Sequence, residues 1–193
     1  DTTRQGDNHA LVVIDMQAYF VERDDNHTEP GNARMYQELV AEQLRLITLA
    51  RAQGMPIVFI EYEGYGETAS PLRQAVAGHE PLATFPKNSD GMFESYNSHL
   101  PRLSEFLRGQ EVGNLIVAGA NGGACVRSSI LGALANNYSV LAYSRGIADF
   151  NYDPFIYPYD DKYNFTPTCP SCSFREFDDM ESLTLAVNMG GPT

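Results

Sequence analysis

Runs of apolar, β-branched residues alternate with segments of helical periodicity along most of this chain, and that alternation limits the fold more than any other feature. Long apolar runs predict buried strands, and they lie at 9–17, 55–62, 114–120 and 138–144. Apolar residues at helical spacing predict helices between them, at 33–53, 70–78, 98–107 and 125–137. Strands that alternate with helices in this way form βαβ units. The sequence therefore predicts an α/β protein with three layers, α/β/α, around a central, mostly parallel sheet.

Cap residues mark the ends of two of these helices. Gly54 follows the first long helix as a C-cap. Ser70 is expected as the N-cap of the next helix, with Pro71 at its first helical position. Lys87, which follows that helix, is expected in a loop.

The composition and periodicity of the sequence change after Phe150. Residues 151–176 are rich in Tyr and Pro and show no periodicity. Structureless segments of this length are usually functional or disordered, and the aromatic density argues against disorder. This segment is therefore predicted to be an ordered flap or an oligomer contact, followed by a final short helix within 177–187. No internal repeat or linker is visible, which predicts one domain over residues 1–193.

The chain is acidic, with a net charge of −12 over 193 residues. Such a charge repels phosphate backbones and anionic membranes, so a small-molecule substrate is expected rather than nucleic acid or a membrane. No apolar run has the length of a membrane span, and the first residues lack the apolar core of a signal peptide. Three cysteines are too few for a disulfide framework. A cytoplasmic protein is expected, with a processed, exported form as the alternative because the chain does not begin with Met.

Three reactive side chains fall near the carboxyl ends of predicted strands, where open parallel sheets bind ligands. They are Asp15 after the first strand, Lys87 in mid-chain and Cys125 after the third strand. Asp15 could equally be an N-cap or a salt-bridge partner, and Lys87 could be a solvated loop lysine. Lys87 stands out because only one other lysine, Lys162, occurs in the chain. Unlike Arg, a lysine can lose its proton or serve as a compact charge beside a carboxylate.

Cys125 is predicted to begin a helix directly after a strand. The helix macrodipole and free backbone N–H groups at that position would stabilise a thiolate, and the same N–H groups could hold an oxyanion. Asn121, Gly122 and Gly123 would let the backbone approach a substrate closely. The alternative is a buried structural thiol, which is the commoner role of a single cysteine.

The joint order of Asp15, Lys87 and Cys125 resembles that of the isochorismatase-like cysteine hydrolase superfamily. The matching segments are ALVVIDMQ, FPKNSDGMF and VAGANGGACVRSSILGALANNYSVL, so that the resemblance covers about residues 9–150. It implies an isochorismatase-like, Rossmann-like topology and a hydrolase that acts on small molecules. The superfamily includes nicotinamidases, carbamoylsarcosine amidohydrolases and maleamate amidohydrolases.

The resemblance also implies a role for each residue of the site. Cys125 would be the nucleophile, Asp15 would accept the thiol proton and pass it to the leaving amine, and Lys87 would lie between them. Relatives often have a cis peptide four residues before the nucleophile, here Ala120–Asn121, which would aim the N–H groups of Asn121 and Cys125 at an oxyanion. Members of the superfamily also commonly form homo-oligomers.

Two departures from the superfamily pattern affect the expected chemistry. Nicotinamidases of this fold carry an Asp-x-His element and a later His as a metal site. Here the matching stretch has Glu61 and Glu63 but no His, and His79 and His99 are isolated. The sequence therefore predicts an enzyme without a metal or other cofactor. The acidic dipeptide that usually precedes the nucleophile is replaced by Gly-Gly-Ala, which makes that turn smaller.

Secondary candidates for substrate binding lie around the same strand ends. Phe20, Tyr62 and Tyr65 could form apolar walls of a pocket or could simply pack, and Gly122 could approach a substrate through its backbone. Arg145 could anchor a substrate carboxylate or could be a surface residue.

The pair Cys169 and Cys172, in a CPSC sequence, has three interpretations. The pair could be half of a metal site shared across an oligomer, a redox pair, or a loop with incidental thiols, because two ligands make no closed zinc site.

These observations predict a cysteine hydrolase that cleaves a C–N bond, amide or carbamoyl, through a covalent Cys125 acyl-enzyme. One alternative is an isochorismatase-type hydrolase that acts on a different small substrate. Others are a non-catalytic binding or scaffold protein on the same fold, and a redox protein that uses the CPSC pair.

Overall fold

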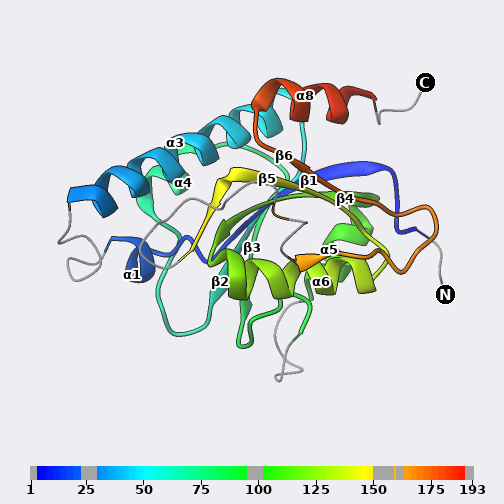
Figure 1. Ribbon diagram of the computed structural model, residues 1–193, viewed down its shortest axis with the longest axis horizontal. Helices are drawn as coiled ribbons and strands as arrows, with labels where there is room; N and C mark the ends of the chain where they lie inside the picture. The colour runs from blue at the N-terminus through cyan, green and yellow to red at the C-terminus, as the bar shows by residue number, and fades with distance from the viewer. Residues whose placement is uncertain (1–3, 23–29, 95–101, 150–158, 160–162, 190–193) are drawn as a thin grey trace.

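A six-stranded sheet forms the centre of the computed structural model, which describes residues 4–22, 30–94, 102–149, 159 and 163–189. The sheet order is β3-β2-β1-β4-β5-β6, and every neighbouring pair is parallel. This arrangement confirms the predicted α/β/α class and shows that the sheet is wholly parallel (Figure 1). The strands are β1 (Asn8–Ile14), β2 (Ile57–Tyr62), β3 (Leu82–Lys87), β4 (Val112–Ala120), β5 (Ser139–Ala148) and β6 (Phe174–Phe177).

Helices cover both faces of the sheet (Figure 1). One face packs against α3 (Pro30–Ala52), α4 (Ser70–Ala75) and α8 (Met180–Met189), and the other against α5 (Leu103–Gly109) and α6 (Arg127–Ala135). A short α1 (Ala18–Val21) follows β1. Alternate residues of each central strand enter opposite cores, as the pleat of a strand requires: Leu11 and Val13 of β1 face α3, whereas Ala10 and Val12 face α6. Within the described residues, no helix is both long and apolar enough to cross a lipid bilayer.

The two strands that the sequence does not predict both lie at the edges of the sheet. β3 pairs with β2 alone, and most of its residues are only partly buried. Lys87 is therefore the last residue of a strand, and its expected place in a loop is wrong. A strand with a proline at its fifth position and little apolar alternation is typical of a sheet edge and gives a weak sequence signal. β6 is a four-residue edge strand inside the expected Tyr- and Pro-rich flap.

The predicted helices occur with shifted ends. The expected helix at 125–137 is a π-helical turn (Gly122–Val126) followed by α6. Ala69, not Ser70, is the N-cap of α4, and it makes no side-chain cap. α5 begins at Leu103, and residues 98–101 of the expected helix lie outside the described residues. Residues 151–158 and 160–162 of the predicted flap lie outside them as well.

Gly119 allows β4 to pass close to the end of β1. Its φ angle is +136°, and a Cβ atom built there would lie 2.2 Å from the carbonyl oxygen of Ile14. Both the backbone conformation and the contact exclude a side chain. Because Ile14 precedes Asp15, this close approach fixes the strand end that carries the first reactive residue.

We expect Gly119→Ala to lower the free energy of unfolding by at least about 3 kcal/mol, since strain and collision act together. Urea denaturation measures the loss. Gly54→Ala is the matched control: Gly54 also has a positive φ, +64°, but nothing lies within 4 Å of its added Cβ. Gly54→Ala should lower the free energy of unfolding by only about 1–2 kcal/mol. Equal losses in the two variants would show that the contact with Ile14 is unimportant.

Candidate active site

Three side chains from separate strand ends meet at the carboxyl edge of the sheet. The Lys87 Nζ atom lies 2.9 Å from Asp15 Oδ2 and 3.3 Å from Cys125 Sγ. Asp15 follows β1, Lys87 ends β3, and Cys125 lies in the π-helical turn after β4. The structure thus brings together the three residues that the sequence suggested could face one crevice, with Lys87 at the end of a strand instead of in a loop.

Lys87 is a buried cation with every hydrogen engaged. Only 1% of its surface is exposed, and its third donor contact is to the carbonyl oxygen of Ser89, at 2.9 Å. Its Nζ atom also lies 4.2 Å from the centre of the Tyr62 ring, which adds a cation–π contact. An ammonium group has three donors, and Asp15, Ser89 and Cys125 accept all three. This placement rules out the solvated loop lysine.

Asp15 is held in a conformation that is uncommon for a non-glycine residue. Its φ angle is +52°, and its backbone N–H donates to the carbonyl oxygen of Ile60 at 2.9 Å. The N-cap of the following helix is Gln17, not Asp15. Burial raises the pKa of the Asp15 carboxyl, and the Lys87 charge opposes part of that rise. Among the described residues, the buried Oδ1 atom has no hydrogen-bond partner, so it is the oxygen that can receive a proton.

The Cys125 thiol is protonated at neutral pH. Burial raises its pKa to about 12, and the neighbouring Asp15 carboxylate adds to the rise, whereas Lys87 lowers it. The resting thiolate that the sequence suggested is opposed here by burial and by the Asp15 carboxylate, which together outweigh the Lys87 charge. A thiol of this kind needs a base beside it before it can act as a nucleophile.

Asp15→Asn should lower the pKa of Cys125 from about 12 towards its ordinary value. The variant removes the carboxylate charge that raises the thiol pKa and keeps the Lys87 ammonium that lowers it. Ultraviolet absorbance of the thiolate against pH measures the shift, with Asp15→Asn/Cys125→Ala as the baseline for the two other cysteines. An unchanged or higher pKa would show that the Asp15 charge does not reach the thiol.

A cis peptide bond and two backbone hydrogen bonds shape the turn that carries Cys125. The peptide bond between Ala120 and Asn121 is cis. The N–H groups of Ala124 and Val126 donate to the carbonyl oxygen of Asn121, at 3.1 and 3.0 Å. The use of the Asn121 and Cys125 N–H groups as oxyanion donors stays a prediction.

The C-terminal segment explains why small residues precede Cys125. A Cβ atom on Gly123 would lie 3.0 Å from the Tyr163 hydroxyl and 3.2 Å from Asp149 Oδ2. Tyr159, which is fully buried, donates its hydroxyl to the carbonyl oxygen of Gly122 at 2.6 Å. Sequence reasoning missed Tyr159 and Tyr163, and the only signal was the density of tyrosine in this segment.

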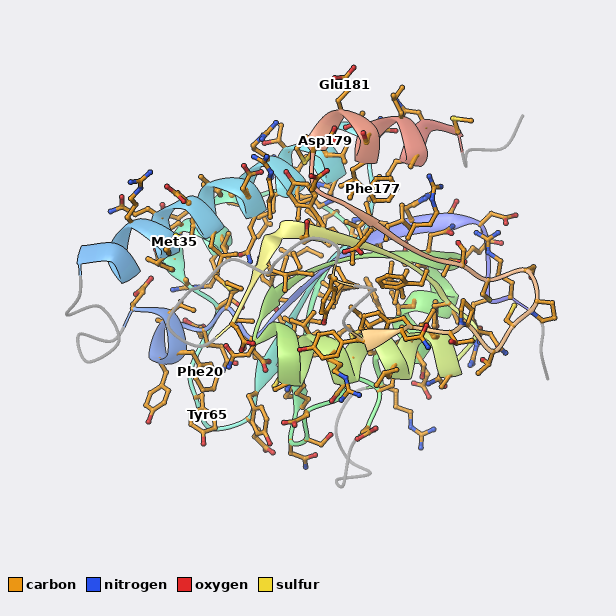
Figure 2. The ribbon with its side chains drawn as sticks, in the orientation of Figure 1. Phe20, Met35, Tyr65, Phe177, Asp179 and Glu181 are labelled. Carbon is orange, nitrogen blue, oxygen red and sulfur yellow. The ribbon has the colours of Figure 1, made fainter. Side chains whose placement is uncertain are left out.

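The predicted aromatic residues form one cluster beside the site. The ring centre of Tyr65 lies 4.8 Å from that of Phe20 and 5.6 Å from that of Tyr62, and Figure 2 shows Phe20 and Tyr65 together near α1. Gln17 ties α1 to β2, because its side chain bonds to both the N–H and the carbonyl of Tyr62. Tyr62 joins the cluster to Lys87. Contact of these rings with a substrate stays a prediction.

Arg145 lies away from the candidate active site. It lines a cavity of about 350 Å³ between β5 and α3, which also includes Met35 (Figure 2), Glu38 and Glu42. This is the face of the sheet that α3 covers, whereas the π-helical turn leads into α6 on the opposite face. The structure does not bring Arg145 to Cys125.

Two of the four remaining titratable candidates, Glu61 and His79, have structural partners. Glu61 accepts hydrogen bonds from the backbone N–H and the hydroxyl of Thr68, at 2.7 and 2.9 Å. Buried His79 contacts the carbonyl oxygen of Met55 at 2.6 Å. Glu63 is exposed, and His99 lies outside the described residues.

The two cysteines of the CPSC sequence are both free thiols. Cys172 donates to the carbonyl oxygen of Asn137 at 3.3 Å, and the neighbouring Cys172 and Ser171 side chains lower the pKa of Cys169. Across the described ranges, no three His, Cys, Asp or Glu residues gather in a way that could hold a metal ion. The two ligands of a half-site would not form such a group, so the half-site, the redox pair and the incidental loop all stay predictions.

The wholly parallel sheet has the fold of solved isochorismatase-like proteins. The sequence model of the Isochorismatase domain matches residues 9–154. The chain therefore belongs to the isochorismatase family, as its sequence predicted.

Three similar proteins illustrate the range of the family. A protein of Arabidopsis thaliana described as a probable inactive nicotinamidase is 24% identical over 151 residues, which cover 68% of this chain and 75% of that protein. An isochorismatase-like hydrolase of Alkaliphilus metalliredigens has a TM-score of 0.67 at 19% identity, covering 93% of this chain and 98% of its own. The N-carbamoylsarcosine amidase of Thermoplasma acidophilum has a TM-score of 0.63 at 18% identity, covering 90% and 99%.

Proposed function

We propose that this protein is a cysteine hydrolase that cleaves a C–N bond, amide or carbamoyl, in a small molecule through a covalent Cys125 intermediate. The observation that carries the proposal is that one buried lysine contacts both of the other residues of the site. Lys87 bonds at once to the Asp15 carboxylate and to the Cys125 sulfur, at 2.9 and 3.3 Å. A purely structural thiol has no need of a buried ion pair, which is costly to desolvate.

The first half of the reaction forms the acyl-enzyme. Asp15 takes the thiol proton, and the sulfur attacks the substrate carbonyl to form the C–S bond. The amine leaves as the C–N bond breaks, and it takes with it the proton that Asp15 received. Lys87 stays charged throughout and stabilises whichever partner is negative, the carboxylate or the thiolate.

The second half releases the product. Asp15, again a carboxylate, removes a proton from water as the water attacks the thioester, and the C–S bond breaks. The proton returns to the Cys125 sulfur and restores the resting thiol. The raised pKa of the Asp15 carboxyl suits both steps, because a base whose pKa lies closer to neutrality holds a transferred proton longer.

The relatives support hydrolysis and leave two alternatives open. An amidase shares the fold, whereas the Arabidopsis relative is described as inactive. The alternatives are a non-catalytic binding protein and a hydrolase that acts on a different small substrate. We propose chemistry without a metal, because Glu61 and Glu63 stand where a nicotinamidase carries its metal-binding element and Glu61 is bonded to Thr68.

A screen of small amides, ureas and carbamoyl compounds for ammonia release tests the proposal. We expect turnover of at least one class, a substrate-derived mass adduct on Cys125, and complete inhibition after alkylation of that thiol. Turnover that survives stoichiometric alkylation of Cys125 would contradict the mechanism. Ligands that raise the melting temperature without being consumed would favour the binding protein.

A further inference from the structure

We propose that Asp90 makes this site selective for substrates that carry a positive charge, such as a protonated amine or a guanidinium group, next to the bond that is cleaved. This inference rests on the proposed role of Cys125 as nucleophile. Asp90 was not singled out by the sequence, because nothing in its neighbourhood distinguishes it from a surface acid. Its position beside the thiol is what assigns it a role.

Asp90 lies next to the proposed reacting atom. Its Oδ1 atom is 3.8 Å from Cys125 Sγ, and its side chain is exposed, unlike those of Asp15 and Lys87. A substrate that approaches Cys125 from solvent therefore meets the Asp90 carboxylate before it meets the buried ion pair.

The turn that carries Asp90 is tied to the site on both sides. Lys87 donates to the carbonyl oxygen of Ser89 just before it, and the Ser89 hydroxyl bonds to the carbonyl oxygens of Gly91 and Glu94. The N–H of Met92 donates to the hydroxyl of Ser129 on α6, at 3.1 Å. The backbone that carries Asp90 is thus held in place beside the thiol, as a residue that sets specificity requires.

The charges around the thiol leave Asp90 without compensation. Asp15 and Lys87 neutralise each other, and in the described part of the chain no ion pair involves Asp90. Arg127 lies over the ring of Tyr163, and Arg145 lines the cavity on the other face. A substrate carboxylate would therefore face an unbalanced negative charge, whereas a cation would be attracted. The net charge of −12 favours the approach of cations as well.

Methanethiosulfonate reagents of different charge test the proposal without any need for turnover. The Cys125 thiolate attacks the sulfenyl sulfur, a disulfide forms, and methanesulfinate leaves with the electron pair. The aminoethyl reagent is cationic, the methyl reagent neutral and the sulfonatoethyl reagent anionic. The rate at Cys125, followed by peptide mass spectrometry, is divided by the rate of the same reagent with N-acetylcysteine.

We expect the normalised rate to be about fivefold higher for the cationic reagent than for the neutral one, and lower for the anionic one. In Asp90→Asn the three normalised rates should become nearly equal. Ratios between reagents cancel any change in the pKa of Cys125. Glu181→Gln, a matched change on α8 across the sheet (Figures 1 and 2), should keep the wild-type ratios. Equal rates in the wild type, or ratios that Asp90→Asn leaves unchanged, would overturn the proposal.

Paired amides separate this inference from the proposed function. Glycinamide carries an ammonium group beside its amide, and propionamide is its neutral counterpart of similar size. We expect kcat/KM to favour the cationic amide, and Asp90→Asn to reduce that preference at least about fivefold. Cys125-dependent turnover that favours the neutral amide in wild type would refute selection by Asp90 and leave the hydrolase intact. If neither amide is turned over, the reagent ratios still decide the role of Asp90.

Discussion

Cys125→Ser is expected to lower kcat/KM for the best amide in the screen by on the order of 10³-fold or more. The hydroxyl is a much weaker acid than a thiol, and Asp15 is too weak a base to activate it at this position. The residual rate would come from binding and orientation of the substrate by the rest of the site. The rate of ammonia release, with that amide as the only substrate, measures the change.

The fold of this variant should be intact, because serine is close to cysteine in shape and Cys125 is only partly buried. Its melting temperature should stay within a few degrees of the wild type. Cys172→Ser, which changes a partly buried thiol far along the chain, should keep full activity. Equal losses in Cys125→Ser and Cys172→Ser would point to a general effect on folding instead of a loss of the nucleophile.

Lys87→Met should remove most of the activity and also destabilise the fold by about 3–5 kcal/mol at neutral pH, because it leaves the Asp15 carboxylate buried without its cation. The deficit should depend on pH. Burial already raises the pKa of Asp15 with Lys87 present, and removal of the lysine raises it further. The folded variant then keeps the Asp15 proton to a higher pH than the unfolded chain does. The free energy of unfolding therefore falls as the pH rises from about 4, the unfolded pKa, through the folded pKa.

Urea denaturation at several pH values measures this dependence. The double variant Lys87→Met/Asp15→Asn carries no buried charge at this position, so it should recover much of the stability at neutral pH while staying inactive. A double variant that is less stable than Lys87→Met would contradict the account. So would a deficit that is the same at acid and neutral pH.

The sequence predicts the central part of the fold well because its strands are buried on both faces. β1, β2, β4 and β5 are runs of apolar residues with little alternation, which is typical of the interior of a parallel sheet. β3 and β6 lie at the edges, where burial is partial and one side of the strand is unpaired. Periodicity carries little information in such strands, so they were missed.

Some features of the candidate site could also be predicted from the sequence, whereas others could not. Asp15 and Cys125 could be assigned to one edge because parallel strands end together, whereas Lys87 was linked to them only by the order of the three residues along the chain. The rise in the pKa of Cys125 could not be predicted, since it depends on burial and on the distance to Asp15. Asp90 and Tyr159 could not be found either. Each acts through one contact, to Cys125 and to Gly122, that no pattern along the chain records.

The hydrogen bond from Tyr159 to Gly122 limits how this chain could be recombined with its relatives. The two residues lie 37 positions apart in the sequence, and the bond is buried. A chimera that exchanges the C-terminal segment alone would leave the Gly122 carbonyl without its donor, at a cost of about 1–3 kcal/mol. A side chain at position 123 would in turn press on the Tyr163 hydroxyl, which would lie 3.0 Å from the added Cβ atom. A design that exchanges the turn around Gly122 should therefore keep a hydroxyl donor at the place of Tyr159, and one that replaces Tyr159 should supply another donor to the Gly122 carbonyl.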